Sequence, residues 1–224
     1  MPLERMGIAW RAAQDLEEGM IVNLGLGLPV TIADFLPPGR EVFFHAENGA
    51  IGAGPLASPA LADPDLVDAG SRRITLREGA TIVDSIASFA MIRGGHIDVA
   101  ILGAFEVAEN GDLANWDRPG GNKGPLVGGA MDLAAGARAV RVVMEHTTRD
   151  GSPRLVSRCT LPLTALACVK RIYTDLATID ITDHGFLVRE IVPDLTREAL
   201  ANLTGAPLSF SSDCRPLLVP PHPS

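Results

Sequence analysis

A glutamate in a glycine-rich stretch is the residue of this sequence best suited to chemistry. Glu47 is followed by Asn48, Gly49 and further glycines. Residues 41–44 are typical of a short buried strand, so Glu47 is expected just past a strand's carboxyl end, where open α/β sheets bind ligands. Glycines there let backbone N–H groups approach a ligand closely. A carboxylate among such donors can act as a nucleophile; the alternative is an acidic residue in an ordinary Asn-Gly turn.

A second glycine stretch precedes a short helical pattern. Gly128, Gly129 and Ala130 leave backbone N–H groups free at the start of this helix, where they can bind an acyl oxygen or a phosphate. Asn115 and Lys123 lie in the long connection before it and can supply an amide and a cation. The alternatives are a tight turn that needs no side chains and a solvated lysine.

Other candidate groups are histidines near predicted strand ends. His45 stands two residues before Glu47 and can orient or protonate a group beside it. Glu145 and His146 follow another predicted strand and form either an acid–base pair or a structural hydrogen-bonded pair. The G-x-G after the first strand lacks a third glycine, because position 30 is valine, so NAD binding is rejected. The standard hydrolase, nucleotide-binding and zinc signatures are absent from the sequence.

Composition and charge narrow the class of protein. The chain has 224 residues, 46% of them hydrophobic, which fits one domain with a sizeable core. Its net charge of -8 argues against nucleic acid as a partner, since phosphates require a basic surface. Three scattered cysteines have no metal-binding spacing, so we predict no metal site and a reducing compartment. No apolar segment is long enough for a signal or a membrane span, and we expect a cytoplasmic protein without a membrane partner.

Hydrophobic periodicity predicts alternating helices and strands. Helices are expected at residues 4–18, 29–35, 85–93 and 196–203, and strands at residues 21–24, 41–44, 97–103, 139–144, 172–174, 176–181 and 186–192. The two runs at 97–103 and 139–144 are almost wholly apolar, which indicates strands covered on both faces. The glycines after Glu47 are expected to end the strand before them, with an irregular stretch to about residue 70.

These elements predict an α/β fold with a single open, largely parallel sheet. The last three strands are joined by short turns, which indicates an antiparallel edge to that sheet. No repeat or linker divides the chain, so residues 1–207 are expected to form one domain. Residues 208–224 are rich in proline towards their end and show no periodicity, and we expect them to form a loose tail.

The motifs, taken together, resemble the B subunit of the two-subunit 3-oxoacid CoA-transferases. The resemblance runs from about residue 6 to Pro207, and the matching stretches are residues 22–29, 47–55, 88–96, 111–116, 128–133, 144–147 and 159–164. It implies the CoA-transferase type of α/β fold. It also implies a reaction that moves coenzyme A between two carboxylic acids, with CoA as a substrate and no cofactor or metal. A separate A subunit of similar fold is the implied partner, in a heterodimer or heterotetramer.

Glu47 matches the family's nucleophilic glutamate, and two departures accompany that match. Ala46 stands where the family usually has serine, and the loop from residue 119 to 128 differs from the usual pattern around Lys123. The predicted contacts to substrate and CoA are Asn48, Gly49, Gly128, Gly129, Ala130, Asn115 and Lys123. The alternatives are a non-catalytic scaffold subunit of the same fold and a sugar-phosphate isomerase with Glu47 as its base. The sequence leaves the acid pair open among succinate with acetoacetate, succinate with 3-oxoadipate, and acetate with a short acyl-CoA.

Overall fold

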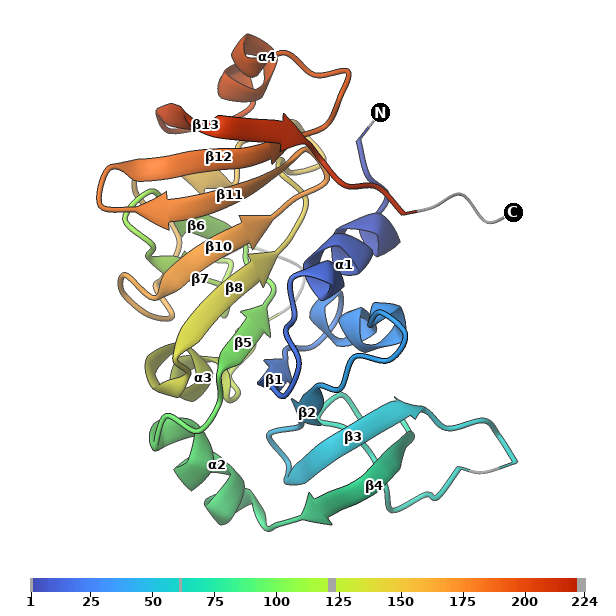
Figure 1. Ribbon diagram of the computed structural model, residues 1–224. Coiled ribbons are helices and arrows are strands. Elements are labelled where there is room, and N and C mark those ends of the chain that lie inside the picture. The colour runs from blue at the N-terminus through green and yellow to red at the C-terminus, as the bar shows by residue number, and fades with distance from the viewer. Residues whose placement is uncertain (1, 61, 121–123, 221–224) are drawn as a thin grey trace.

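Parallel strands form the centre of the molecule. The structure is a computed structural model that describes residues 2–60, 62–120 and 124–220. Within these residues ten strands form one sheet, with the order β13-β12-β11-β10-β8-β5-β1-β2-β3-β4 (Figure 1). The central parallel strands are β1 (Ile21–Leu24), β2 (Phe43–His45), β5 (Val99–Leu102), β8 (Ala139–Val143) and β10 (Val169–Tyr173). The predicted α/β fold with a largely parallel sheet is confirmed.

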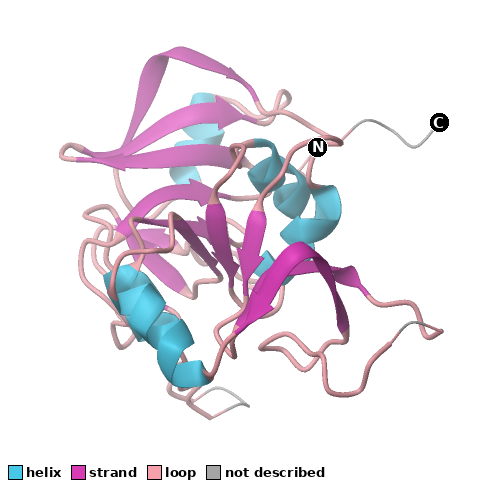
Figure 2. Ribbon diagram, turned by 60° about the horizontal axis from the view of Figure 1, so that its bottom comes forward, coloured by secondary structure: helices cyan, strands magenta, loops and turns pink. Residues whose placement is uncertain are grey.

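Helices cover both faces of these central strands (Figure 2). The alternating side chains of β5 show this directly: Val99 and Ile101 join the core under helix α1, while Ala100 and Leu102 join the core under helices α2 and α3. Because both faces are buried, all four residues of the strand are apolar. The helices are α1 (Arg5–Gln14), α2 (Ser85–Arg93), α3 (Ala130–Gly136), α4 (Arg197–Asn202) and the 3-10 helix η1 (Pro29–Phe35). Helix α1 ends earlier than the predicted residue 18.

The prediction that glycines end the strand region after Glu47 was wrong. The chain turns at residues 46–49 and returns as β3 (Ala50–Leu56), antiparallel to β2, followed by β4 (Ile74–Ile82) at the edge of the sheet. Gly52 lies inside β3 with a φ of +84°, next to a register shift between β3 and β4. The strand accommodates its glycines because they sit at such irregularities, which is where sheets place them.

The C-terminal strands lie on the opposite side of the central ones. β11 (Ala177–Thr182) and β12 (Gly185–Ile191) are antiparallel, as expected, and α4 then leads to β13 (Leu208–Pro216), which pairs parallel with β12. The expectation of a loose tail from residue 208 therefore fails for this segment. Leu208 and Phe210 pack against the core, and Leu217 is buried. Proline-rich composition hid a strand that the crossover through α4 brings back to the sheet. Residues 221–224 lie outside the described residues.

A second, small sheet packs beside the main one. Its strands are β7 (Leu113–Ala114), β6 (Glu106–Ala108) and β9 (Leu155–Val156), in that order. Two of these strands interrupt the region that follows β5. The long connection predicted from residue 109 is therefore partly ordered by pairing, and Asn115 directly follows β7.

A buried ion network fastens α1 to the sheet. Arg11 donates to Glu190 with its Nε 2.6 Å from Oε2, and both side chains are almost fully buried. Arg215 donates to the same carboxylate at 2.8 Å. Arg11 also donates to Asp15, which in turn accepts from Arg171 at 2.9 Å. Two cations and one carboxylate thus hold β12, β13 and α1 in one arrangement.

Candidate active site

A tight turn presents Glu47 at the carboxyl end of β2. The N–H of Ala46 donates to the carbonyl of Ala50 at 2.8 Å, and the N–H of Gly49 donates back to the carbonyl of Ala46 at 2.9 Å. Gly49 has a φ of +123°, and a Cβ at this position would lie 2.0 Å from the carbonyl oxygen of Val83. Only glycine fits there. The sequence Glu-Asn-Gly therefore fixes where the carboxylate leaves the sheet.

The Glu47 carboxylate rests on the backbone of Gly129, the residue that precedes α3. A Cβ on Gly129 would lie 2.2 Å from Oε2 of Glu47, so no side chain can occupy this position without moving the carboxylate. The structure thus brings together the two glycine-rich stretches that the sequence singled out.

Burial makes Glu47 harder to ionise than an ordinary glutamate. Burial raises its pKa, a hydrogen bond from the Gly129 backbone opposes the rise, and the nearby Asp132 carboxylate adds to it. The net shift is upward. A carboxylate that is desolvated and lacks a cationic partner among the described residues is less stabilised, and is accordingly a better nucleophile.

A cavity of about 660 Å³ opens in front of Glu47. It runs along the carboxyl ends of the central strands, as expected for an open α/β sheet. Its wall comes from the segments that follow β1, β5 and β8 and from the start of α3. Of the predicted site residues, Glu47, Asn115, Gly128, Gly129 and Ala130 line it. Asn48 and Gly49 lie in the turn without lining the cavity, and Lys123 lies outside the described residues.

The side chains of Asn115 and Asn48 are both used to hold loops. Asn115 donates from Nδ2 to the carbonyl of Gly103 at 3.0 Å and accepts from the hydroxyl of Thr164 at 2.7 Å. Asn48 donates to the carbonyl of Val67 at 2.8 Å. Asn115 therefore ties two segments of the cavity wall together, while Asn48 anchors the loop that follows β3. Whether either touches a substrate stays a prediction.

Both candidate histidines are buried parts of the interior. His45 lies between Asn23 and Ser88, at 3.0 and 2.9 Å. Because the Asn23 amide nitrogen can only donate, Nδ1 of His45 accepts and Nε2 carries the proton. His146 lies between the hydroxyls of Thr174 and Thr204. Burial lowers the pKa of each histidine to about 4, so both are neutral at physiological pH.

Glu145 and His146 do not form an acid–base pair, because they face opposite directions. Glu145 lines the cavity and forms ion pairs with Arg5 at 2.9 Å and Arg154 at 3.2 Å. The sequence analysis overlooked both arginines. Arg5 begins α1 and Arg154 precedes β9, far apart in the sequence, and no local pattern marks either as a cavity residue.

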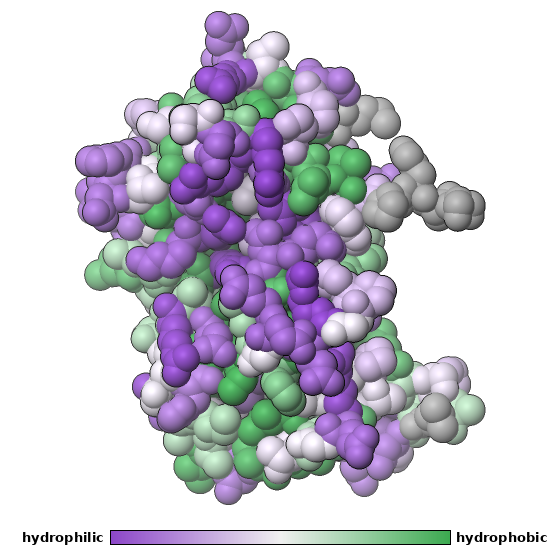
Figure 3. All heavy atoms as spheres, viewed as in Figure 1, coloured by the Kyte–Doolittle hydropathy of each residue, from purple (hydrophilic) through white to green (hydrophobic). Residues whose placement is uncertain are grey.

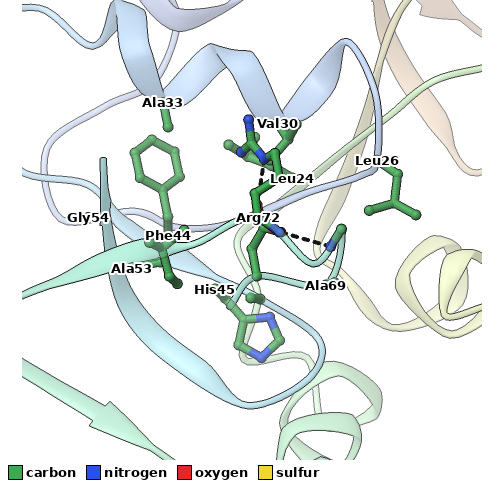
Figure 4. Close-up of a pocket in the computed structure, with 14 residues that line it drawn as sticks. Leu24, Leu26, Val30, Ala33, Phe44, His45, Ala53, Gly54, Ala69 and Arg72 are labelled. Carbon is green, nitrogen blue, oxygen red and sulfur yellow. Dashed lines mark hydrogen bonds and ion pairs between the residues drawn. The ribbon is translucent and has the colours of Figure 1, made fainter. Parts of the chain in front are cut away.

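A much smaller pocket of about 40 Å³ lies behind the turn (Figure 4). Phe44, Ala46 and His45 line one side of it, and Arg72, held by Asp68 at 2.8 Å, lines the other. Its volume is far below what a drug-sized ligand requires. Ala46 therefore points its methyl group away from the large cavity and into the interior beneath Glu47.

The fold and the cavity define a class of α/β enzyme with a carboxylate at the sheet's carboxyl edge, and the family follows from sequence comparison. Residues 5–202 match the family model described as coenzyme A transferase. The chain therefore belongs to the coenzyme A transferase family, and the predicted enzyme class, CoA-transferase, is confirmed.

Several relatives are named as B subunits. The B subunit of 3-oxoadipate CoA-transferase from Pseudomonas putida is 49% identical over 92% of this chain and 96% of the relative. The B subunit of succinyl-CoA:3-ketoacid coenzyme A transferase from Helicobacter pylori is 43% identical over 90% of this chain and 97% of the relative. The human mitochondrial succinyl-CoA:3-ketoacid coenzyme A transferase 2 is 41% identical over 95% of this chain and 41% of its own length.

Solved structures of low identity share the fold. An acyl-CoA transferase of Escherichia coli O157:H7 aligns with a TM-score of 0.72 at 17% identity, covering 96% of this chain and 44% of that one. Glutaconate coenzyme A-transferase of Acidaminococcus fermentans aligns with a TM-score of 0.70 at 15% identity, covering 97% and 89%. Within the described residues, no helix is long and apolar enough to cross a membrane.

Proposed function

We propose that this chain is the catalytic subunit of a CoA-transferase that moves coenzyme A between a 3-oxoacid and a second carboxylic acid such as succinate. The observation that carries the proposal is the Glu47 carboxylate, which faces a cavity of about 660 Å³ and is seated on Gly129. The upward shift of its pKa fits a nucleophile that must be charged yet poorly solvated.

The reaction passes through a thioester on Glu47. The carboxylate attacks the thioester carbonyl of the acyl-CoA donor, the C–S bond breaks, and a mixed anhydride and CoA thiolate result. The thiolate then attacks the Glu47 carbonyl of the anhydride, which releases the first acid as its carboxylate and leaves glutamyl-CoA. The acceptor acid runs the same steps in reverse. The kinetics are therefore ping-pong, and CoA is a substrate rather than a cofactor.

The backbone around Gly129 has two roles in this mechanism. It positions the Glu47 carboxylate for attack, and the amides of Gly129 and Ala130 can stabilise the oxyanion that forms at each tetrahedral step. Gly128, Asn115, Asn48, Gly49 and Lys123 are proposed as contacts to substrate and CoA. Water must be excluded during turnover, since both the anhydride and the thioester hydrolyse.

A partner protein is part of the proposal. Several relatives are named as B subunits, which implies an A subunit beside them. At the cavity, Leu26, Leu126 and Val127 leave 62, 56 and 79% of their surface exposed. More exposed apolar side chains, Ile82 and Ile86 among them, belong to the end formed by β3, β4 and α2, where Figure 3 shows hydrophobic residues at the surface. Exposed apolar surface beside a reactive site is suited to a protein partner that closes it. We place the complex in the cytoplasm.

The alternative of a non-catalytic scaffold subunit rested on Ala46, which replaces the usual serine. Ala46 lines the small pocket beneath the turn and does not line the large cavity. A hydroxyl at this position would accordingly belong to the support of the turn, and its absence leaves the carboxylate in place. We therefore favour the catalytic role.

Covalent labelling tests the proposal. The complex with its A subunit is incubated with succinyl-CoA in the absence of an acceptor, and we expect the mass of this chain to rise by a CoA group. Borohydride reduces the thioester, and peptide mapping should place the mark on Glu47. Glu47→Gln should remove the label and the turnover together. An active complex that never carries a label would show that Glu47 is not a nucleophile.

A further inference from the structure

Four charged residues line the large cavity within the described part of the chain, and they gather at two ends. Glu47 follows β2, whereas Glu145 follows β8 and contacts both Arg5 and Arg154. β5 and β1 separate β8 from β2 in the sheet, so three strand spacings lie between the two glutamates. At about 4.8 Å for each spacing, their backbones are roughly 14 Å apart. One end of the cavity thus holds the reactive carboxylate and the other holds two arginines.

Arg154 is fixed in the wall at the arginine end. It is 15% exposed and donates to the carbonyl of Phe105 at 3.1 Å, to the carbonyl of Ala104, and to the Glu145 carboxylate at 3.2 Å. Its Nε and both Nη atoms therefore have protein partners. Arg154 holds the segment after β5 and Glu145 in position and has little capacity left for a ligand.

Arg5 differs from Arg154 in being available. Its side chain is 63% exposed, and its guanidinium makes one bond within the described residues, from Nη1 to Oε1 of Glu145 at 2.9 Å. An exposed pair of this kind contributes little to stability, so exchanging one carboxylate partner for another costs little. Two cations share one carboxylate at this end, which leaves one positive charge uncompensated by the described cavity lining there.

We propose that Arg5 determines specificity by binding the distal carboxylate of a dicarboxylic acid substrate, which displaces Glu145 from its guanidinium. This inference rests on the proposed function, because the other end of the same substrate must be the acyl group that reacts at Glu47. A guanidinium binds a carboxylate in a planar, bidentate geometry, which also sets the direction of the acid in the cavity. A short monocarboxylic acid at Glu47 has no group that reaches this end.

The test compares succinate with butyrate, which have the same chain length and differ in the second carboxylate. Transfer from a common acyl-CoA donor is measured for the wild-type complex and for Arg5→Gln, Glu145→Gln and Arg138→Gln. Arg138 is the matched control: it is 66% exposed and paired with Asp98 at 2.7 Å, and it does not line the cavity.

Arg5→Gln should lower kcat/KM for succinate by about 10- to 100-fold, chiefly through KM, and change it for butyrate by less than about 3-fold, because only succinate loses a charge-assisted hydrogen bond. Glu145→Gln removes the competing carboxylate and should raise the preference for succinate. Arg138→Gln should leave the preference unchanged. If the Arg5–Glu145 pair were merely structural, both of its variants would shift activity in the same direction for both acids. That result would overturn the proposal.

Two further readings separate other sources of failure. An equal loss with both acids, accompanied by a higher KM for the acyl-CoA donor, would overturn the proposal and assign Arg5 to an anionic group of CoA instead. Calorimetric titration of the complex with succinate and butyrate needs no turnover: the wild type should bind succinate more tightly, and Arg5→Gln should abolish that difference. Equal binding of both acids by the wild type would sink this inference. Absence of transfer from any donor would count against the proposed function alone.

Discussion

Glu47 and Glu190 both belong to the main sheet region, but their surroundings shift their pKa in opposite directions. Burial raises the pKa of Glu190 when considered alone, but hydrogen bonds and charges from Arg11 and Arg215 outweigh it and the pKa is lowered. Glu47 has no such cation among the described residues, and its pKa is raised. The carboxylate of Glu190 is therefore stabilised as an ion, while that of Glu47 is not.

The difference follows from what each region must do. Around Glu190, cations saturate the carboxylate and fasten α1 to β12 and β13, so its charge holds the fold together. Around Glu47, glycines bring backbone amides close, and a hydrogen bond from Gly129 holds the carboxylate without neutralising it. A fully paired carboxylate attacks poorly, because its charge is already stabilised in the ground state.

The largest expected effect separates the two glutamates by activity. Glu47→Gln should lower kcat of the complex by at least about 10³-fold, because a neutral amide cannot form the anhydride. Thermal stability of the chain should be unchanged or higher. Glu78→Gln, at an exposed position beside Gly79 in β4, is the control and should keep full activity. Substantial transfer by Glu47→Gln would contradict the catalytic role.

Glu190→Gln should produce the opposite result. It leaves Arg11 buried with less charge compensation, and loss of a partner in a buried pair costs about 3–5 kcal/mol. The melting temperature should fall by about 10 °C, as followed by circular dichroism. Activity per folded complex should stay close to wild type below the transition. A melting temperature equal to that of the wild type would show that the ion network is not a stabilising element.

Gly129→Ala tests the seat of the Glu47 carboxylate. The added Cβ would lie 2.2 Å from Oε2, so the carboxylate must move, and a displacement of about 1 Å can cost on the order of 10²-fold in kcat. Gly124→Ala is the matched control in the same region, since a Cβ there meets no atom within 4 Å. Initial rates of both complexes at saturating substrate decide the matter. If both variants were equally active, Gly129 would not position Glu47.

The smallest effect is the pH dependence of stability, and it should have opposite signs at the two glutamates. The raised pKa of Glu47 means that ionising it opposes folding, so Glu47→Gln should be the more stable protein at neutral pH, and its advantage should vanish as pH falls through that pKa. The lowered pKa of Glu190 means that its contribution is complete above the ordinary value of 4.5 and is lost below it.

Urea unfolding of the wild type and both variants between pH 4 and 8 measures these differences. Protonation of the unfolded chain at His45 and His146, whose folded pKa values are about 4, contributes equally to all three proteins and cancels in the comparison. Gaps that respond to pH in the same direction for both glutamates would refute the contrast between them.

Local patterns in the sequence determined much of the fold. Asp84 caps α2 by accepting from the N–H of Ala87, as its position before an apolar stripe predicted. The apolar run that forms β5 predicted a strand covered on both faces. Glu47 and the glycines around it marked the reactive turn. Caps, periodicity and glycine turns are properties of neighbouring residues, and the sequence states them directly.

Only the tertiary structure decided which distant residues share the cavity. Gly129 meets Glu47, and Arg5 meets Glu145, because the strand order β8-β5-β1-β2 brings their segments to one edge. The same packing placed His45 inside the protein instead of beside Glu47. Strand order depends on long-range pairing and on which faces the helices cover, and a local pattern encodes neither. For that reason the reactive carboxylate could be predicted from the sequence, whereas its seat and the arginine end of the cavity could not.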